Sequence, residues 1–326
     1  MSCSKYEIPK QMSVLKIDTT KLVMHTSQNS ILPSNQVNVV HTHQGNVWMG
    51  TVDGLALKKS SSWSLFNTLN SRLPNNYITA IESDNFNNLW VGTLAGLAVY
   101  DGRIWKDLDS VNQKYFSNAI VNDIIYDRFN DLIWIATSNG ILRFDKKVWK
   151  LFNSTNSGLM DDYVITLTMD KSNQLVLGTF DQFQFRGKLW KYDMQNWTST
   201  KLDDKGLNSS FPGHLLQSQN GNLYFTTKGT TGSAFVEING SIWNVYSKNQ
   251  NENFKTEVTS VADWKDYILI GKSDGLMRYD GKEFLNIDLN YPGNYNMYVS
   301  DLEVSDDGTI YMATYNNGLC EILLAE

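Results

Sequence analysis

Residues 73–105 read LPNNYITAIESDNFNNLWVGTLAGLAVYDGRIW. This stretch contains three short apolar runs and the start of a fourth, each separated from the next by turn residues. Asp101-Gly102 stands between two runs of β-forming residues, an arrangement typical of a tight hairpin, because glycine tolerates the positive φ that such turns need. The stretch therefore predicts a four-stranded antiparallel meander whose last strand begins near Trp105.

The same pattern recurs along the chain. Its clearest marker is an apolar–aromatic–apolar–small–Thr motif at the second strand, as in residues 89–93 (LWVGT). The small position recurs every 42 to 48 residues, at Gly50, Gly92, Ala136, Gly178, Thr226, Gly271 and Ala313. Four-stranded repeats with this period are the signature of β-propeller blades. We expect the small residue where two blades meet, because a larger side chain would hold the sheets apart.

The two ends of the chain complement each other. The seventh repeat stops one strand short after residues 319–323, whereas residues 22–33 align without a gap with residues 63–74, which begin with a fourth strand. A ring of sheets requires closure, because a gap leaves strand edges unpaired. The sequence therefore predicts an all-β fold, a single seven-bladed β-propeller with four-stranded antiparallel blades, closed by an N-terminal strand that completes the last blade. Residues 1–14 are expected to be a tail and residues 15–326 the propeller.

Composition excludes several classes of protein. A net charge of −6 argues against a nucleic-acid partner, since phosphate binding needs clustered Lys and Arg. No apolar run approaches the roughly 18 residues that span a bilayer, so no transmembrane segment is expected. The two cysteines predict no disulfide framework. Cys320 is expected to be a small core residue, whereas Cys3 is either part of a polar tail or the acylated cysteine of an envelope lipoprotein whose leader is not visible.

The repeat around residues 70–105 is specific enough for a family comparison. Its motifs are Asn-Ser-x-Leu-Pro-x-Asn-x-Val/Ile, then Asp-x-x-x-Asn-Leu-Trp-Val-Gly-Thr-x-x-Gly-Leu, then Tyr-Asp-Gly-x-x-Trp. They resemble the two-component regulator propeller repeat, and looser copies extend the resemblance over nearly the whole chain from Leu22. Repeats of this type build the periplasmic sensor regions of hybrid histidine kinases, many in Bacteroidetes, which detect oligosaccharides. The resemblance therefore implies signal transduction in the periplasm or cell envelope, with a sensor kinase or another envelope protein as partner.

Such receptors usually carry a second propeller, an immunoglobulin-like domain, a membrane helix and a kinase, and this sequence shows none of them. The chain is either an excised piece of a receptor or a stand-alone envelope protein. The closure of a single ring favours the stand-alone interpretation.

Departures from the repeat indicate where a ligand could bind, because loops carry function on a rigid scaffold. Three elongations are expected on the face that holds the loops entering the first strands: residues 180–186, residues 228–233 and residues 288–298. Their aromatic and polar side chains suit a sugar, with candidates Phe180, Phe183, Phe185, Arg186, Lys228, Tyr291 and Tyr295. On the same face Asn35, Asn76, Asn118 and Asp162 are expected around the axial funnel. The alternatives are that the inserts cap the ring and that these four residues serve turn chemistry.

Catalytic and metal-binding patterns are sparse. His214 precedes the core of a first strand and is the one candidate general base, as a propeller lyase or hydrolase would require, but no partner can be placed beside it. His41 and His43 share one face of a strand without an apparent third ligand, so no metal and no cofactor are predicted. Asp161-Asp162, Asp203-Asp204 and Asp306-Asp307 are expected to be solvated turns. The sequence thus favours a non-catalytic sensor-like module that binds a glycan or similar small ligand; the alternatives are a His214-dependent enzyme and a protein–protein interaction scaffold.

Overall fold

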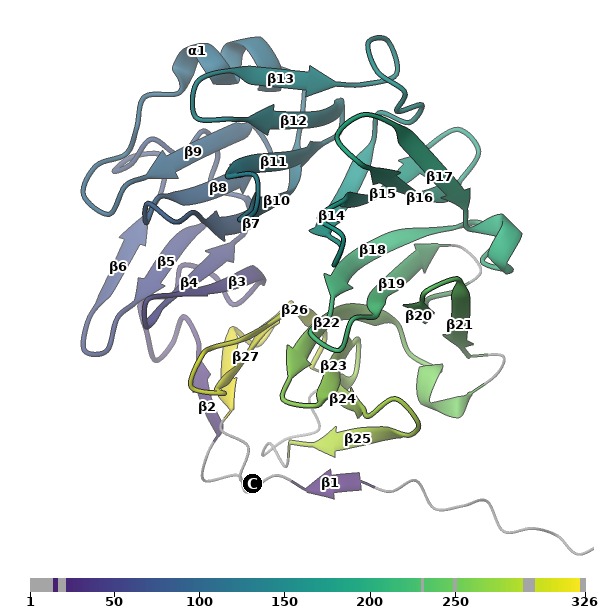
Figure 1. Cartoon of the computed structure of the whole chain (residues 1–326). Helices are drawn as coiled ribbons and strands as arrows, with labels where there is room; N and C mark the ends of the chain where they lie inside the picture. Colours follow the sequence, from purple (N-terminus) through teal and green to yellow (C-terminus); the bar gives the residue numbers. More distant parts are fainter. Residues whose placement is uncertain (1–13, 17–21, 230–231, 249–250, 290–296, 323–326) are drawn as a thin grey trace, which may run out of the picture.

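Seven antiparallel sheets stand side by side in a ring around a central axis (Figure 1). The structure is a computed structural model and describes residues 14–16, 22–229, 232–248, 251–289 and 297–322. Each sheet is a blade, numbered here from 1 to 7 in the order of its innermost strand along the chain. The arrangement confirms the predicted seven-bladed β-propeller.

Each blade is a meander that runs outward from the axis. The innermost strands are β3 (Val37–His43), β7 (Ile78–Ser83), β10 (Val121–Asp127), β14 (Val164–Met169), β18 (Ser210–Gln217), β22 (Val258–Trp264) and β26 (Val299–Val304). The second strands are β4 (Asn46–Thr51), β8 (Leu89–Thr93), β11 (Leu132–Thr137), β15 (Leu175–Asp181), β19 (Leu223–Gly229), β23 (Tyr267–Lys272) and β27 (Ile310–Thr314).

The outer half of each blade contains the remaining strands. The third strands are β5 (Gly54–Lys58), β9 (Gly96–Tyr100), β12 (Gly140–Phe144), β16 (Arg186–Tyr192), β20 (Ala234–Asn239), β24 (Gly275–Tyr279) and β28 (Leu319–Ile322). The outermost strands are β6 (Trp63–Phe66), β13 (Trp149–Phe152), β17 (Trp197–Lys201), β21 (Ile242–Ser247), β25 (Phe284–Asp288) and, in blade 7, β2 (Leu22–His25).

Blade 7 contains strands from both ends of the chain. β2 pairs antiparallel with β28, with Leu22 opposite Ile322 and His25 opposite Leu319. Side chains support this pairing: the Glu321 carboxylate accepts a hydrogen bond from Lys58 Nζ at 2.9 Å and lies 3.0 Å from His25 Nε2. The N-terminal strand is therefore held to the C-terminal one by backbone and by charge.

Two blades depart from four strands. In blade 2 the predicted fourth strand is reduced to a single bridge between Tyr100 and Trp105, and the chain continues into the short turns α1 (Asp109–Val111) and η2 (Asn112–Phe116). Asn112 explains this local path, because its side chain bonds the backbone of Leu97 in both directions. In blade 6 the short strand β1 (Val14–Lys16) pairs in parallel with β25 as a fifth strand, which the sequence did not indicate.

In the four repeats where the small residue is glycine, it lies against the next blade, as predicted. A Cβ on Gly50 would come within 2.5 Å of Ile78 Cγ2 in blade 2, and a Cβ on Gly178 would come within 2.5 Å of Pro212 Cβ in blade 5. The aromatic residue two positions earlier faces the same neighbouring blade, because side chains two apart on a strand share a face. Trp90 and Trp134 are buried and share apolar clusters with Val121 and Val164 of the next blades. These tryptophans therefore build the interfaces between blades and offer no exposed platform for a sugar.

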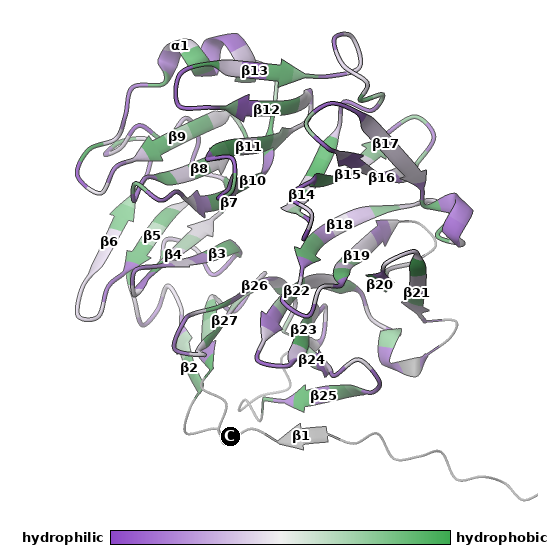
Figure 2. Cartoon of the chain, in the orientation of Figure 1, coloured by the Kyte–Doolittle hydropathy of each residue, from purple (hydrophilic) through white to green (hydrophobic). Residues whose placement is uncertain are grey.

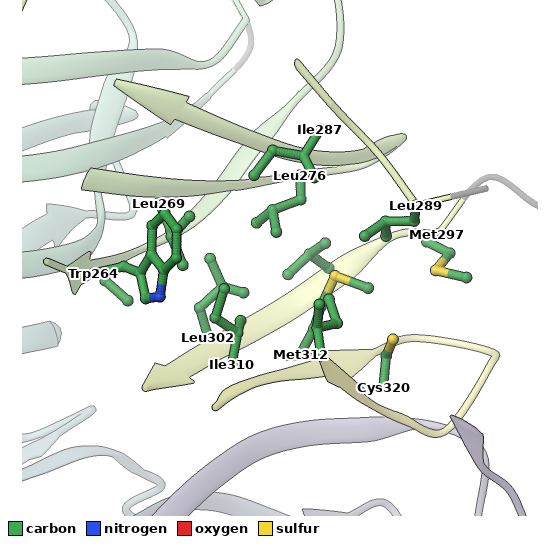
Figure 3. Packing of buried hydrophobic residues seen from close by; sticks show 13 residues of the cluster. Trp264, Leu269, Leu276, Ile287, Leu289, Met297, Leu302, Ile310, Met312 and Cys320 are labelled. Carbon is green, nitrogen blue, oxygen red and sulfur yellow. The ribbon is translucent and has the colours of Figure 1, made fainter. Parts of the chain in front are cut away.

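The core consists of separate apolar layers between neighbouring blades. Figure 2 shows that apolar residues follow the strands, while polar residues dominate the connecting turns. Figure 3 shows the layer between blades 6 and 7, where Trp264, Leu276, Met312 and Cys320 belong to one buried cluster. Cys320 is a free, buried thiol, and burial raises its pKa to about 12, so it is a core residue as expected. Cys3 lies outside the described residues.

Candidate functional site

The seven inner strands enclose an axial cavity of about 950 Å³. Every inner strand contributes residues to the cavity wall. Each strand begins at one mouth of the cavity and ends near the other. Each inner strand also has a register irregularity near its start, as between Val121 and Asp123 in β10 and between Val299 and Asp301 in β26. The bulge interrupts the pairing within the sheet, so a backbone N–H group close to the bulge has no partner in its own blade and can donate a hydrogen bond to a neighbouring blade.

Side chains at the bulge position satisfy these freed amides across the blade boundary. Four such bonds link consecutive blades: Leu167 N–H to Asp123 Oδ2 (2.7 Å), Leu215 N–H to Thr166 Oγ1 (3.2 Å), Val261 N–H to His214 Nδ1 (3.2 Å) and Val40 N–H to Asp301 Oδ2 (3.1 Å). These polar residues of the cavity wall therefore connect consecutive blades by hydrogen bonds. Their remaining polar atoms are available to the cavity.

Seven residues with carboxyl groups line this cavity, and we call four of them the acidic ring: Glu82, Asp123, Asp301 and Glu303. Burial raises the pKa of Glu82 to about 8, of Asp123 and Glu303 to about 7, and of Asp301 to about 6. At Glu82, Asp123 and Glu303, repulsion from neighbouring carboxylates also raises the pKa. Among the described residues, no Lys or Arg lies within ion-pair distance of any of the four.

A histidine–serine cluster lies at the end of the cavity where the inner strands finish. Ser83 Oγ is 2.9 Å from His41 Nε2 and 3.0 Å from His43 Nδ1, while His41 Nδ1 is 3.9 Å from Glu303 Oε1. Burial lowers the pKa of His41 to about 3, with repulsion from His43 as a further cause, so the ring is neutral at physiological pH. The described residues hold no group of three or more His, Cys, Asp or Glu side chains arranged for a metal ion.

His214 lines the cavity beside a carboxylate, 3.9 Å from Nε2 to Asp301 Oδ1. Burial lowers its pKa to about 4, so the imidazole is neutral. Because Val261 donates its N–H to Nδ1, that nitrogen is the acceptor and Nε2 carries the hydrogen. The nitrogen that faces Asp301 is therefore a hydrogen-bond donor and does not have the lone pair that a general base needs.

Three of the four residues predicted around the funnel cap local turns. Each accepts a backbone N–H from eight residues earlier: Asn35 from Ser27 (2.8 Å), Asn76 from Thr68 (2.9 Å) and Asp162 from Ser154 (2.7 Å). Asn118 accepts a bond from Asn139 through its backbone carbonyl. None of the four lines the axial cavity. Turn chemistry thus accounts for Asn35, Asn76 and Asp162.

The blade-4 insert forms a longer β15–β16 hairpin at the mouth where the inner strands begin. Phe180 packs on Phe211 of β18, with ring centroids 4.3 Å apart, and on Phe185 at 5.9 Å. Arg186 pairs with Asp203 at 3.1 Å. Phe183 is 98% exposed at the tip, and Phe185 is 57% exposed. One ring of the insert therefore packs between blades as the capping alternative requires, while the tip presents aromatic surface.

The other predicted residues divide between the cavity and the undescribed part of the chain. Lys228, at the end of β19, lines the axial cavity together with His214. Tyr291 and Tyr295 lie outside the described residues. Asp161 is not the solvated turn residue that we expected, because its carboxylate is buried and binds Lys188 Nζ at 2.7 Å and Trp190 Nε1 at 3.0 Å. Asp306 and Asp307 border the cavity.

The acidic ring was not among the residues singled out from the sequence. Its members belong to three blades, and only the ring closure brings Glu82 of blade 2 and Glu303 of blade 7 to the same cavity. The signal was present in the aligned inner strands, where His41, Glu82 and Glu303 occupy one repeat position and Asp123, His214 and Asp301 another.

The protein is thus a seven-bladed propeller with a polar axial cavity. Comparison with known proteins relates one of its repeats to a known family. Residues 72–95 match the family model described as Two component regulator propeller, which confirms the resemblance at that repeat. None of the curated proteins matches the chain in sequence. In the described part of the chain, no helix reaches the length and apolarity needed to cross a bilayer.

Solved structures share the fold at low sequence identity. The extracellular domain of the hybrid two-component system BT3049 from B. thetaiotaomicron superposes with a TM-score of 0.76 at 20% identity, covering 93% of this chain and 41% of that one. Streptogramin B lyase superposes with a TM-score of 0.70 at 13% identity, covering 94% of this chain and 99% of the lyase chain. The structure of YCF48 bound to D1 peptide superposes with a TM-score of 0.65 at 11% identity, covering 97% of this chain and 98% of that chain. The chain thus spans about two-fifths of the length of the BT3049 domain.

Proposed function

We propose that this propeller is a non-catalytic, sensor-like recognition module of the periplasm or cell envelope. In this proposal it binds a glycan or similar extracellular ligand at the axial cavity and its loop-rich mouth. The observation that carries the proposal is the cavity of about 950 Å³ lined by convergent polar groups from all seven inner strands. Rigid concavities of this size with a few oriented polar groups are the usual form of small-molecule sites. Residues 72–95 and the shared fold with an extracellular two-component domain support the sensor role.

The proposed contacts combine the cavity wall with the mouth. His214 offers an Nε2–H donor, Lys228 offers an ammonium group near the mouth, and the hairpin tip offers the rings of Phe183 and Phe185. Sugars bind through hydroxyl groups to such donors and through their C–H faces to aromatic rings. A sensor kinase or another envelope protein would then read the occupied state.

A glycan library screened against the purified chain by thermal shift tests this function. A ligand that binds only the folded state raises the melting temperature by mass action. We expect at least one oligosaccharide to stabilise the protein, and Lys228→Gln to reduce that shift without changing the melting temperature of the free protein. If no glycan in the library raised the melting temperature, the glycan proposal would be refuted.

A second candidate function is a protein–protein scaffold, favoured by the exposed phenyl ring of Phe183. An almost fully exposed phenylalanine beside a half-exposed one is characteristic of an interaction surface. Light scattering of the wild type and of Phe183→Ser distinguishes self-association through this tip from a monomer. For the enzyme alternative, Asp301 is the carboxylate partner beside His214 that the sequence did not show. The hydrogen on Nε2 leaves that nitrogen without a lone pair to accept a proton, so we keep the non-catalytic proposal.

A further inference from the structure

Four exposed apolar side chains lie on the face of the ring where the inner strands end, opposite the mouth with the longer loops. The turns that join the first two strands of each blade and those that join the last two share this face, because strands alternate in direction along a meander. Blades 2 and 3 are neighbours in the ring (Figure 1), and each presents an apolar side chain at both turns. The four residues are between 59% and 74% exposed: Phe86, Ile104, Phe129 and Val148.

The two phenyl rings are not needed by the turns that carry them. In these inner turns the carboxylates of Asp84 and Asp127 accept the backbone N–H groups of Phe86 and Phe129. Blade 4 forms the same turn with a polar residue, Ser172, at the equivalent position. An exposed ring also contributes little to the stability of the fold. Neither turn chemistry nor core packing therefore explains the two phenylalanines.

The same holds for the outer turns. Ile104 and Val148 occupy one repeat position, directly before the tryptophan of the fourth strand, and donate their N–H groups to Asp101 and Asp145. Blade 4 forms this turn with Asn196 in their place. Among the described turns of this face, those of blades 2 and 3 alone present an apolar side chain at both positions.

Contacts across the blade boundary bring these turns together. Lys146, in the outer turn of blade 3, places its Nζ 3.9 Å from the centroid of the Phe86 ring in blade 2. The same ammonium group pairs with Asp131, which ends the turn that carries Phe129. Val148 follows Lys146 by two residues. The outer turn of blade 3 therefore lies against both inner turns.

A further contact joins the two turns of blade 2. Lys106 Nζ donates a hydrogen bond to Asn88 Oδ1 at 2.7 Å. Ile104 precedes this lysine by two residues, and Phe86 precedes the asparagine by two residues. The four apolar side chains thus belong to one continuous surface.

Exposed cations surround this surface. Two partly buried layers of charge can be distinguished, since the carboxylates of Asp84 and Asp127 are buried below the turns. At the surface, five exposed cations stand against three partly exposed carboxylates: Arg103, Lys106, Arg128, Lys146 and Lys147 against Asp101, Asp131 and Asp145. Within the described chain, Lys146 is the one member of the five that forms an ion pair. We call the five cations and the four apolar side chains the basic–apolar patch.

The opposite half of the same face has the reverse charge. The described turns of blades 6 and 7 contain no exposed large apolar residue. They expose five carboxylates and two lysines: Asp266, Asp280, Glu283, Asp306 and Asp307 with Lys265 and Lys282. A second copy of the chain would therefore offer charge to the basic–apolar patch through this half, but no apolar surface for its four apolar side chains.

We propose that the basic–apolar patch docks on the surface of a bilayer that contains anionic phospholipids. Apolar side chains at the tips of turns enter the boundary between headgroups and acyl chains, and the Lys and Arg side chains beside them reach the phosphate groups. A bilayer supplies both environments at once. This inference goes beyond the proposed function. In the docked orientation the mouth with the longer loops points away from the membrane and is open to a ligand.

Sedimentation of the full chain with large unilamellar vesicles tests the proposal. The probe is a vesicle of equimolar phosphatidylcholine and phosphatidylglycerol, and phosphatidylcholine alone is the neutral reference. We expect the anionic vesicles to bind the chain at least about ten-fold more tightly than the neutral ones. The difference should shrink as the Debye length shortens from about 10 Å at 0.1 M salt to about 3 Å at 1 M. Equal binding to both vesicles, or binding to neither, overturns the proposal.

Two double variants separate the contributions of the rings and of the charges. F86S/F129S removes both phenyl rings, and R103E/K147E reverses two exposed cations that form no ion pair among the described residues. Each should weaken binding to the anionic vesicles by about ten-fold or more. All four positions are exposed, so the melting temperature should stay close to that of the wild type. Unchanged vesicle binding in both variants overturns the proposal.

Matched controls lie on the same face of the ring. Ile242→Ser removes an apolar side chain that is 62% exposed in the outer turn of blade 5, and Lys282→Glu reverses an exposed lysine in the outer turn of blade 6. Neither position belongs to the basic–apolar patch, so both variants should bind the anionic vesicles as the wild type does. A loss in the controls equal to that in the double variants overturns the assignment to blades 2 and 3.

Light scattering without vesicles identifies the other occupant of the patch. A monomeric wild type that binds the anionic vesicles supports the proposal. An oligomer that dissociates in R103E/K147E, together with no vesicle binding, overturns it and assigns the patch to a second copy of the chain. Neither result affects glycan recognition, which the thermal-shift screen tests separately.

Discussion

Replacing Glu82 by Gln should make the protein more stable at alkaline pH and leave its stability at acid pH unchanged. The carboxyl group of Glu82 is protonated in the folded state up to about pH 8, because burial opposes its ionisation, whereas in the unfolded chain it ionises near 4.5. Between these values the folded state binds the extra proton, so the free energy of unfolding falls as the pH rises. Gln has the same shape and its side-chain oxygen can still accept the Ser83 N–H.

The magnitude follows from the two pKa values. Each pKa unit corresponds to about 1.4 kcal/mol, so the full shift would correspond to about 5 kcal/mol if the site were perfectly dry. Glu82 is only partly buried by surface area, and solvent screens part of the penalty. We therefore expect Glu82→Gln to raise the free energy of unfolding by about 2 kcal/mol at pH 8.5 and by less than about 0.5 kcal/mol at pH 5.

Urea unfolding followed by tryptophan fluorescence at both pH values measures this difference. Asp204→Asn is the control, since Asp204 is exposed on the turn η3 (Asp203–Lys205) and its replacement should have the same small effect at both pH values. If Glu82→Gln were destabilising at pH 8.5, or if its effect were independent of pH, Glu82 would not be a desolvated carboxyl of the cavity wall.

Three further predictions concern the ring and its surface. Gly50→Ala should destabilise the protein by about 2 kcal/mol in urea unfolding, because the new Cβ would overlap Ile78 of the next blade; a neutral effect would contradict close blade packing at this position. Glu321→Gln should cost about 1 kcal/mol at pH 7, and the cost should disappear as the pH falls below 4.5, since bonds from His25 and Lys58 lower the pKa of the Glu321 carboxyl; a cost that persists at pH 3 would rule out this origin. Phe183→Ser should change the free energy of unfolding by less than about 0.5 kcal/mol, because the ring is exposed; a large loss would show that the hairpin tip is packed.

Repetition made the ring predictable from sequence. The small position at Gly50 and Gly178 has one physical cause in every blade, so its spacing counts the blades. The outer edges were less predictable, because they depend on single contacts. Asn112 redirects the chain after Trp105, so most of the fourth strand of blade 2 is missing. Residues Val14–Lys16 add a strand to blade 6 through backbone pairing, which no side-chain pattern in the sequence indicates.

The candidate site was only partly predictable for a related reason. Asn35 and Asn76 were attractive because polar residues surround the entrances of the inner strands, yet their side chains are used to cap turns. His214 and Lys228 do line the cavity. Glu82 and Glu303 lie 221 positions apart in the sequence (303 minus 82) and approach each other only when the ring closes. Alignment of the inner strands by repeat position shows such groups, whereas inspection of inserts does not.

The most direct test of ligand recognition in the axial cavity is a crystal structure of the chain with the tightest ligand from the glycan screen. We predict ligand density inside the axial cavity, with a hydroxyl group within hydrogen-bond distance of His214 Nε2 or Lys228 Nζ. Density confined to the outer edges of the blades, with the cavity wall unchanged, would contradict the account.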